Sequence, residues 1–242
     1  FIPKELRVDN LDKELTALSL FDFDNDNDLD LYLGYGHNGS KDSISLIDVI
    51  AINDGDGNFM KYEQIPDLFE VTSKVVPFDY DKDDDIDLLI TSRVKPNDYP
   101  NSPRSFLLEN KNGKFEDISD SYLPNNGYLG MITDAEIIDI NNDGKTDIIL
   151  SGEWMGIKIL VSQNNNKFIF GESHFPKNNN GFWNSLETND LDGDGDLDLI
   201  AGNFGKNTPY NISKEKPLLM KYADYNGNGR PDPQVFHICE GN

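Results

Sequence analysis

The sequence is poor in cysteine and histidine, the residues that most often act as soft metal ligands or catalytic groups. Its 242 residues include one cysteine, Cys239, and three histidines, His37, His174 and His237. A single cysteine cannot form an internal disulfide. The histidines lie in unrelated segments without a neighbouring nucleophile motif, so no catalytic centre is indicated. Enzyme activity is left open but is not favoured.

Long apolar segments are also missing. No hydrophobic run reaches the roughly 18–20 residues needed to span a bilayer, so we expect no membrane insertion. Residues 1–5 lack the basic and apolar regions of a secretory signal. The chain starts without Met and within its repeat pattern, which suggests a mature or excised part of a longer protein.

Basic residues are scarce. There are 21 Lys and Arg against 44 Asp and Glu, which gives a formal net charge of −23. Such a surface repels nucleic acid and anionic membranes, so neither is an expected partner. Twenty-one of the 44 acidic residues fall within five nine-residue windows. Self-repulsion concentrated in this way predicts bound cations, and five divalent ions would offset ten negative charges.

These windows form an internal repeat in which Asp or Asn occupies positions 1, 3, 5 and 9. The five loops, numbered in chain order, are 22–30, 79–87, 139–147, 190–198 and 224–232, with start-to-start spacings of 57, 60, 51 and 34 residues. The first four run directly into short apolar segments that read as strands entering a core.

A second motif alternates with the loops. Residues 52–59, 108–115 and 161–168 each join apolar residues across a polar tip rich in Asn, Gly or both. Asn and Gly tolerate the positive φ that tight hairpins require. A unit with an acidic loop, two flanking strands and a hairpin is a four-stranded sheet, and such sheets repeated at this period are typical of propeller blades. The predicted fold is therefore all-β, a β-propeller with four to five blades in this chain.

The predicted organisation is a single β-propeller region over residues 1–242. Its approximate repeats are 9–65, 66–122, 123–175, 176–215 and 216–242, the last incomplete. Residues 1–8 read as an outer strand that could complete the last blade and close a small ring. The alternative, which we favour, is an arc of a larger propeller, because open sheet faces are normally covered by neighbouring repeats.

The loops fit calcium better than other metals. Alternate positions in an extended chain project to one side, so a central bend gathers their oxygens around one point. Position 6 is Gly, Asn or Asp, the residue types that accept positive φ most readily. Position 7 is variable and is expected to contribute its backbone carbonyl. Calcium prefers six to eight oxygen ligands, whereas zinc and copper favour His or Cys, which the loops lack.

The candidate metal ligands are positions 1, 3, 5, 7 and 9 of each loop, for four to five Ca²⁺ ions in all. They are Asp22, Asp24, Asp26, Asp28 and Asp30; Asp79, Asp81, Asp83, Asp85 and Asp87; Asp139, Asn141, Asp143, Lys145 and Asp147; Asp190, Asp192, Asp194, Asp196 and Asp198; and Asp224, Asn226, Asn228, Arg230 and Asp232. Calcium affinity falls with ligand charge, so the fifth loop, with two acids, is expected to bind weakly if at all. For every loop the alternative is an acidic, solvated turn without metal.

Two other calcium motifs are excluded. An EF-hand needs a bidentate Glu at position 12 and flanking helices. Position 12 here is occupied by Leu33, Ile90, Leu150, Ala201 and Val235, none of which can bind a metal. The nine-residue period of the RTX β-roll does not match either.

The repeated loops resemble FG-GAP/VCBS repeats, the calcium-loop blades of integrin α-subunit propellers and of many bacterial surface and secreted proteins. Other segments are similar to bacterial VCBS proteins that carry an ASPIC/UnbV domain. These segments are 92–106, 129–135, 152–155, 183–185 and 202–205. The resemblance implies a propeller, commonly seven-bladed when complete, with calcium between the first two strands of each blade. Asn228 stands where Asp is usual, and the ASPIC/UnbV domain itself is not recognised.

The expected function is that of a calcium-stabilised scaffold for extracellular protein or glycan binding and adhesion. Millimolar extracellular calcium suits modest-affinity sites, which favours an extracellular, cell-surface or periplasmic location. The alternative is the propeller domain of a secreted carbohydrate-active enzyme, a polysaccharide lyase or hydrolase.

Two further features could contact a ligand. The polar segment from Arg93 to Arg104 carries two guanidinium groups suited to carboxylates, although a structural loop whose arginines pair with local Asp is the simpler interpretation. Trp154 and Trp183 could stack on sugar rings or wedge between blades. Basic or aromatic residues converging at one face would favour a glycan binder or an enzyme.

Overall fold

The computed structural model describes residues 13–37, 39, 46–172, 175–176, 179–205, 207–210 and 212–237. Cys239, His174 and the outer strand expected in residues 1–8 lie outside this part of the chain.

The described chain is all-β, as predicted, and is built from antiparallel sheets. The first sheet has the order β1 (Leu15–Phe21), β2 (Asp30–Tyr35), β3 (Val49–Asn53) and β4 (Phe59–Gln64). The second has the order β5 (Val71–Phe78), β6 (Asp87–Val94), β7 (Phe106–Asn110) and β8 (Phe115–Asp117). Two single-turn helices follow, α1 (Ser119–Tyr122) and the 3-10 helix η2 (Pro124–Gly127).

A third set of four strands repeats this order. These are β9 (Met131–Ile138), β10 (Asp147–Met155), β11 (Lys158–Ser162) and β12 (Phe168–Phe170). The end of β10 also pairs with β13 (Gly181–Asn189), which pairs in turn with β14 (Asp198–Asn203). The three expected hairpins are confirmed as β3–β4, β7–β8 and β11–β12.

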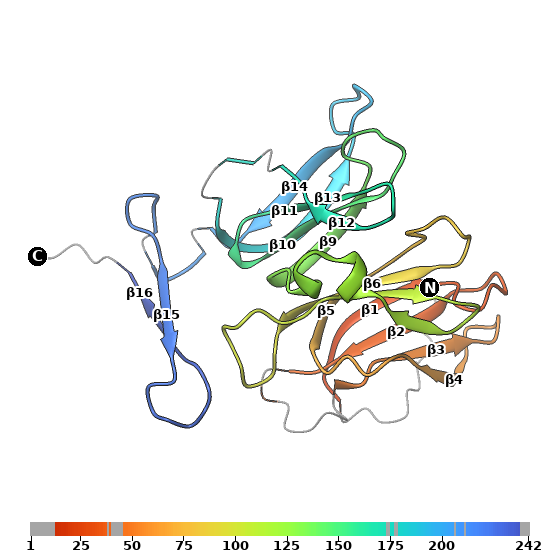
Figure 1. The fold of residues 1–242 in the computed structure, drawn as a ribbon, viewed down its shortest axis with the longest axis horizontal. Helices are drawn as coiled ribbons and strands as arrows, with labels where there is room; N and C mark the ends of the chain where they lie inside the picture. The colour runs from red at the N-terminus through yellow and green to blue at the C-terminus, as the bar shows by residue number, and fades with distance from the viewer. Residues whose placement is uncertain are drawn as a thin grey trace, which may run out of the picture.

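The sheets stack face to face in chain order (Figure 1). On β6, Leu88 and Ile90 pack with residues of the first sheet, whereas Leu89 packs with residues of the third. All three side chains are fully buried. A strand covered on both faces has no need of polar alternation, which explains the continuous apolar runs that follow the acidic loops.

The stack ends in exposed apolar side chains. Leu18 and Leu20 on β1 are 62% and 53% exposed, and Ile200 on β14 is 50% exposed. The described sheets do not close into a ring. Among the described residues, the fourth loop is followed by β14 and by no third strand of its repeat. The sequence of residues 204–218 is rich in Asn, Lys, Ser and Pro and lacks an apolar run.

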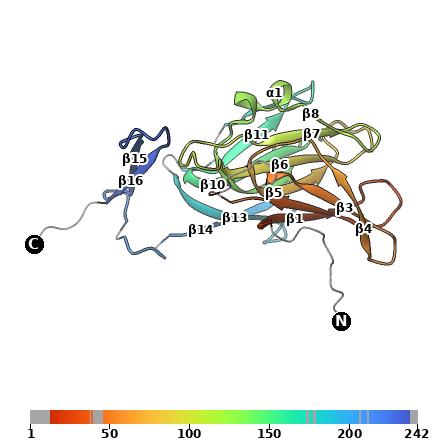
Figure 2. The ribbon, with the colours of Figure 1, turned by 90° about the horizontal axis from the view of Figure 1, so that it is seen from below.

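The last two strands form a separate hairpin, β15 (Leu219–Ala223) and β16 (Asp232–Phe236), which among the described strands pair only with each other. The hairpin stands apart from the stacked sheets in both views (Figures 1 and 2). A polar contact ties it to the second sheet: Arg230 Nη1 donates to Asn97 Oδ1 at 3.0 Å.

Candidate metal centres

Each of the five acidic loops joins two paired strands in the same register. The residue before position 1 faces position 9 across the ladder in every case. These pairs are Phe21 with Asp30, Phe78 with Asp87, Ile138 with Asp147, Asn189 with Asp198 and Ala223 with Asp232. All five loops therefore connect their two strands with the same length and the same strand register.

Two residues of every loop adopt positive φ, where the sequence pattern indicated one. Position 6 was expected, and it is occupied by Asn27, Asp84, Gly144, Gly195 and Gly229. Position 4 shares this conformation and is occupied by Asn25, Lys82, Asn142, Gly193 and Gly227. The positive φ at position 4 was not predicted because Lys82 occupies it in the second loop and lysine rarely adopts positive φ. The other four residues are Asn or Gly.

Backbone amides orient the carboxylates at both ends of each loop. The amide of position 6 donates to the position 1 carboxylate in all five loops, at 2.9, 3.1, 2.7, 3.1 and 2.8 Å in chain order. The amide of position 2 donates to the position 9 carboxylate at 2.8, 3.0, 3.2, 3.0 and 3.0 Å. A side-chain oxygen of position 5 accepts from the position 7 amide in every loop. The loop backbone is therefore wrapped around its own acidic side chains.

Hairpin tips complete the first three loops. The amides of Asn53, Asn110 and Ser162 each donate to the second oxygen of the position 9 carboxylate at 2.8 Å. The sequence pattern missed these residues, although Asn at the start of the first two hairpin tips was a visible signal. The fourth loop has no such hairpin among the described residues.

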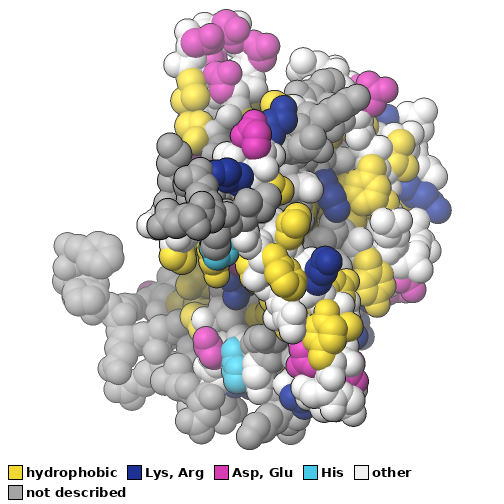
Figure 3. All heavy atoms as spheres, turned by 90° about the vertical axis from the view of Figure 1, so that its left-hand side faces the viewer, with side chains coloured by type: hydrophobic (Ala, Val, Ile, Leu, Met, Phe, Trp, Pro, Cys, Tyr) yellow, Lys and Arg dark blue, Asp and Glu magenta, His cyan; other side chains and the backbone are white. Residues whose placement is uncertain are grey.

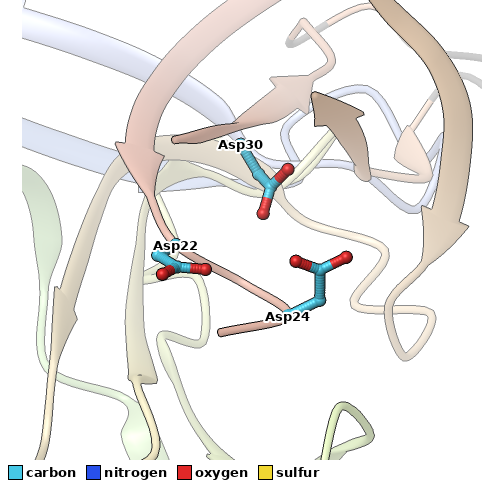
Figure 4. Close-up of side chains that lie close together, drawn as sticks. All are labelled: Asp22, Asp24 and Asp30. Carbon is cyan, nitrogen blue, oxygen red and sulfur yellow. The ribbon is translucent and has the colours of Figure 1, made fainter. Parts of the chain in front are cut away.

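Carboxylate oxygens converge in three of the loops. Positions 1, 3 and 9 of the first loop, Asp22, Asp24 and Asp30, place ligand atoms within 4.8 Å of one another. Figure 4 shows the three side chains pointing toward one common space. Positions 1, 3 and 9 of the second loop and positions 1, 3 and 5 of the fourth meet the same limit. Each of these clusters could hold a metal ion.

The electrostatics of the loops fit a cation. Burial raises the pKa of Asp87 to about 7, and neighbouring carboxylates act in the same direction. Burial first and neighbouring acids second also raise the pKa of Asp28, Asp81 and Asp147. Asp28 Oδ1 and Asp81 Oδ1 are buried without a hydrogen-bond partner. A divalent cation would satisfy these oxygens and reverse the repulsion, and an all-oxygen ligand set matches calcium.

The third and fifth loops differ in charge. Lys145, at position 7 of the third loop, places Nζ 2.8 Å from Asn164 Oδ1 and 3.6 Å from Asp143 Oδ2, so this loop already carries an ammonium group. Arg230, at position 7 of the fifth loop, turns away to Asn97. Both loops keep the shared backbone geometry with fewer carboxylates.

The other sequence-predicted candidates divide into structural and surface groups. Arg104 lies between Asp117 and Asp120, at 2.8 and 2.9 Å, which matches the simpler interpretation of a local ion pair. Arg93 instead pairs with Glu153 of the third sheet at 2.9 Å. Trp183 donates to the backbone oxygen of Asn179 and packs on the apolar cluster around Ile149.

The two tryptophans and the described histidines are likewise separated. Trp154 donates to the hydroxyl of Tyr99 at 2.8 Å, on the surface formed by the second and third sheets. The ring of His237 lies against Tyr210, with centroids 4.9 Å apart. His37 lies beyond the end of β2, where its Nδ1 accepts from the amide of Gly39.

Comparison with known proteins supports the FG-GAP resemblance. Residues 139–201 match the family model of the FG-GAP-like repeat, and this segment contains the third and fourth loops. A search of the curated proteins found no match. Within the part of the chain that the structure describes, no helix is long and apolar enough to cross a membrane.

Proposed function

We propose that the chain is a calcium-binding segment of a β-propeller, in which each acidic loop holds one Ca²⁺ between the first two strands of a blade. The observation that carries this proposal is the shared geometry of the five loops: one register, two positive-φ positions and one pattern of amide donation. Sequences as different as those of the second and fifth loops retain this geometry. The match of residues 139–201 to the FG-GAP-like repeat supports the same interpretation.

Within each loop, the side chains of positions 1, 3, 5 and 9 and the carbonyl of position 7 would hold the ion. The first, second and fourth loops have the densest charge and the convergent carboxylates, so they are the strongest sites. The ion supplies positive charge to a loop whose acidic groups otherwise repel one another, and its binding free energy adds to folding stability. Calcium is thus structural.

The scaffold role follows from the architecture. Three four-stranded units, held at one end by metal loops, leave the loops at the opposite end free to differ in sequence and to contact a ligand. We propose an extracellular, cell-surface or periplasmic location, where calcium at about 1 mM would fill sites of modest affinity. Binding of a protein or glycan is the role that such a scaffold serves.

Calorimetric titration tests the metal assignment. Chain stripped with a chelator should bind four to five Ca²⁺ per molecule, with Zn²⁺ and Mg²⁺ as comparison ions. Calcium should bind more tightly than Mg²⁺, because the loops offer an irregular sphere of many oxygens and not a small octahedron. Absence of saturable calcium binding would contradict the proposal.

A further inference from the structure

A small cleft lies between the second and third sheets. It is lined by Arg93 and Val94 at the end of β6, Tyr99 of the β6–β7 loop and Glu153 of β10, and it has a volume of about 250 Å³. Pockets that enclose whole drug-sized ligands measure about 300–1,000 Å³. This cleft is the right size for one ring of a larger molecule.

The cleft lies at the end of the second and third sheets opposite their own acidic loops. Those loops connect the end of β5 to the start of β6 and the end of β9 to the start of β10, whereas the cleft uses the ends of β6 and β10. Arg230 of the β15–β16 hairpin contacts Asn97 in the β6–β7 loop, so the hairpin marks this side of the molecule. Figure 3 views this side, where hydrophobic side chains lie beside Lys and Arg side chains.

A row of aromatic rings continues from the cleft. The hydroxyl of Tyr99 accepts a hydrogen bond from Trp154 Nε1 at 2.8 Å. The Trp154 and Phe182 ring centroids are 4.7 Å apart, and those of Phe182 and Phe204 are 6.4 Å apart. The first three rings are partly exposed and Phe204 is 47% exposed. These four rings, from the β6–β7 loop, β10, β13 and the residue after β14, form a continuous series that we call the aromatic row. The Trp154 and Phe182 rings meet edge to face at 64°, and the Phe182 and Phe204 rings are tilted by 54°.

The row is fixed in place by backbone and side-chain contacts. Trp154 adopts a φ of 59°, a conformation that a bulky residue rarely takes. The Phe204 amide donates to the Phe182 carbonyl at 2.8 Å. A position that tolerates backbone strain in order to present an aromatic ring at a surface suggests a function for that ring.

The charges at the cleft select the kind of ligand. Arg93 and Glu153 neutralise each other at 2.9 Å, so the cleft presents planar polar groups but little net charge. The net charge of −23 disfavours anionic partners such as nucleic acid. Aromatic faces beside a guanidinium and a carboxylate suit a neutral sugar, whose C–H face packs on a ring while its hydroxyls bond to the charged pair.

We propose that the cleft and the aromatic row bind a neutral oligosaccharide, with one sugar ring in the cleft and the following rings on Trp154, Phe182 and Phe204. Arg93 donates to sugar hydroxyl oxygens and Glu153 accepts from sugar hydroxyl groups. The proposal deepens the scaffold role given above by naming its ligand class, and it rests on that role only in requiring a folded stack of sheets.

The experiment is calorimetric titration of the calcium-saturated chain with cellohexaose, xylohexaose, mannohexaose and chitohexaose. Hexagalacturonate serves as an anionic comparison. We expect saturable binding of at least one neutral hexasaccharide, and quenching of tryptophan fluorescence that tracks binding. Trp154→Ala should weaken that binding at least tenfold. The control is Phe170→Ala, which removes a 40% exposed ring that lies outside the aromatic row, on the outer strand β12.

The outcomes separate this proposal from the metal assignment. Failure of every neutral hexasaccharide to bind, preference for hexagalacturonate, or equal binding by the Trp154 and Phe170 variants would each overturn the sugar site while leaving calcium stoichiometry untouched. Sugar binding without calcium binding would overturn the metal assignment alone. Trp154→Ala could lose binding because it misfolds, so Tyr99→Phe serves as a second variant that removes only the hydroxyl bonded to Trp154. We expect it to bind the same sugar more weakly than the native chain but more tightly than Trp154→Ala.

Discussion

At the scale of single residues, the position 9 aspartates of the first three loops connect each loop to its hairpin. Asp30, Asp87 and Asp147 are buried at the start of the second strand. Each accepts one amide from its own loop and one from a hairpin tip. A carboxylate held in this way would be preorganised for a cation, as the proposed calcium site requires. It is also costly when the site is empty, because burial disfavours the charged form.

Asp87→Asn tests this role. The substitution keeps the shape of the side chain but removes the negative charge and turns one acceptor into a donor facing a backbone amide. We expect the loss of one bound calcium and a decrease of about 2–3 kcal/mol in the free energy of unfolding in calcium. Asp84→Asn is the control, because it removes the same charge from the same loop at an exposed position 6 that accepts Asn. Equal effects of the two substitutions on calcium stoichiometry would contradict the ligand assignment.

Gly195 tests the conformational requirement at position 6. Its φ is +98°, and a Cβ atom at this position would meet nothing within 4 Å, so backbone strain is the only cost of a side chain there. Gly195→Val should lower the free energy of unfolding by about 1–2 kcal/mol, whereas Gly195→Asn should cost far less, since Asn occupies the same position in the first loop. Urea unfolding in saturating calcium measures both. A Val variant as stable as the Asn variant would show that the bend is not required.

Glu70 gives the fold a pH dependence away from the metal loops. Burial raises its pKa to about 7, although the Arg104 amide and the cations of Lys95 and Arg104 act in the opposite direction, while Asp98 adds to the rise. The folded state therefore holds this proton more tightly than the unfolded state, in which Glu titrates near 4.3. Stability is highest below the unfolded pKa and is lost as pH rises through the folded pKa.

Glu70→Gln should remove this contribution. We expect the native protein to lose about 1–2 kcal/mol between roughly pH 5 and pH 8 from this group, and the variant to show a flatter profile. Urea unfolding at fixed calcium across that range makes the measurement. A variant profile as steep as that of the native chain would assign the pH dependence to other groups.

At the scale of elements, the hairpins and the acidic loops act as one unit. Asn110 donates through its side chain to the Ile86 carbonyl at 3.2 Å and accepts from the Gly113 amide at 2.8 Å. Neighbouring loops also touch: Lys82 Nζ donates to the Gly144 carbonyl of the next loop at 2.7 Å. The second and third loops and the hairpin tips bonded to them are therefore connected at this end of the stack.

Asn110→Ala should loosen the second loop without removing a metal ligand. We expect calcium affinity at that loop to fall severalfold and the free energy of unfolding to decrease by about 1–2 kcal/mol, because two backbone groups lose their partners. Lys114→Ala, at an exposed position of the same hairpin, should change neither quantity. Unchanged calcium affinity in the Asn110 variant would contradict the claim that the hairpin tip supports the metal site.

The acidic repeat predicted the loops, their strands and the hairpins because these depend on local chemistry: Asp, Asn and Gly at fixed positions and apolar runs directly after. It did not predict the position 4 conformation, since Lys82 breaks the residue pattern while the backbone keeps it. It also missed the amides of Asn53, Asn110 and Ser162, because backbone donors leave little trace in the residue type. The aromatic row could not be predicted for another reason, since Tyr99, Trp154, Phe182 and Phe204 meet only through the pairing of β10 with β13 and the packing of that sheet beside the second sheet.

At the scale of the whole molecule, apolar burial between the sheets stabilises the fold, whereas repulsion between the acidic side chains destabilises it. The interior sheets are held by clusters that bury both faces of β6 and β10. The five acidic loops hold 21 of the 44 acidic residues of a chain whose net charge is −23. Bound calcium would offset the repulsion between the acidic side chains of the loops, whereas salt can only screen it. The exposed leucines of β1 and Ile200 of β14 mark the two ends of the stack, where the described chain has no further sheet to cover them.

The most direct test of the account is thermal unfolding in about 1 mM calcium and again after chelation, at matched ionic strength. We expect a Tm that is higher in calcium by about 10 °C or more, since several sites of modest affinity each add mass-action stability. Sodium chloride alone should recover only a small part of this difference. An unchanged Tm after chelation would contradict the central claim that the loops are structural calcium sites.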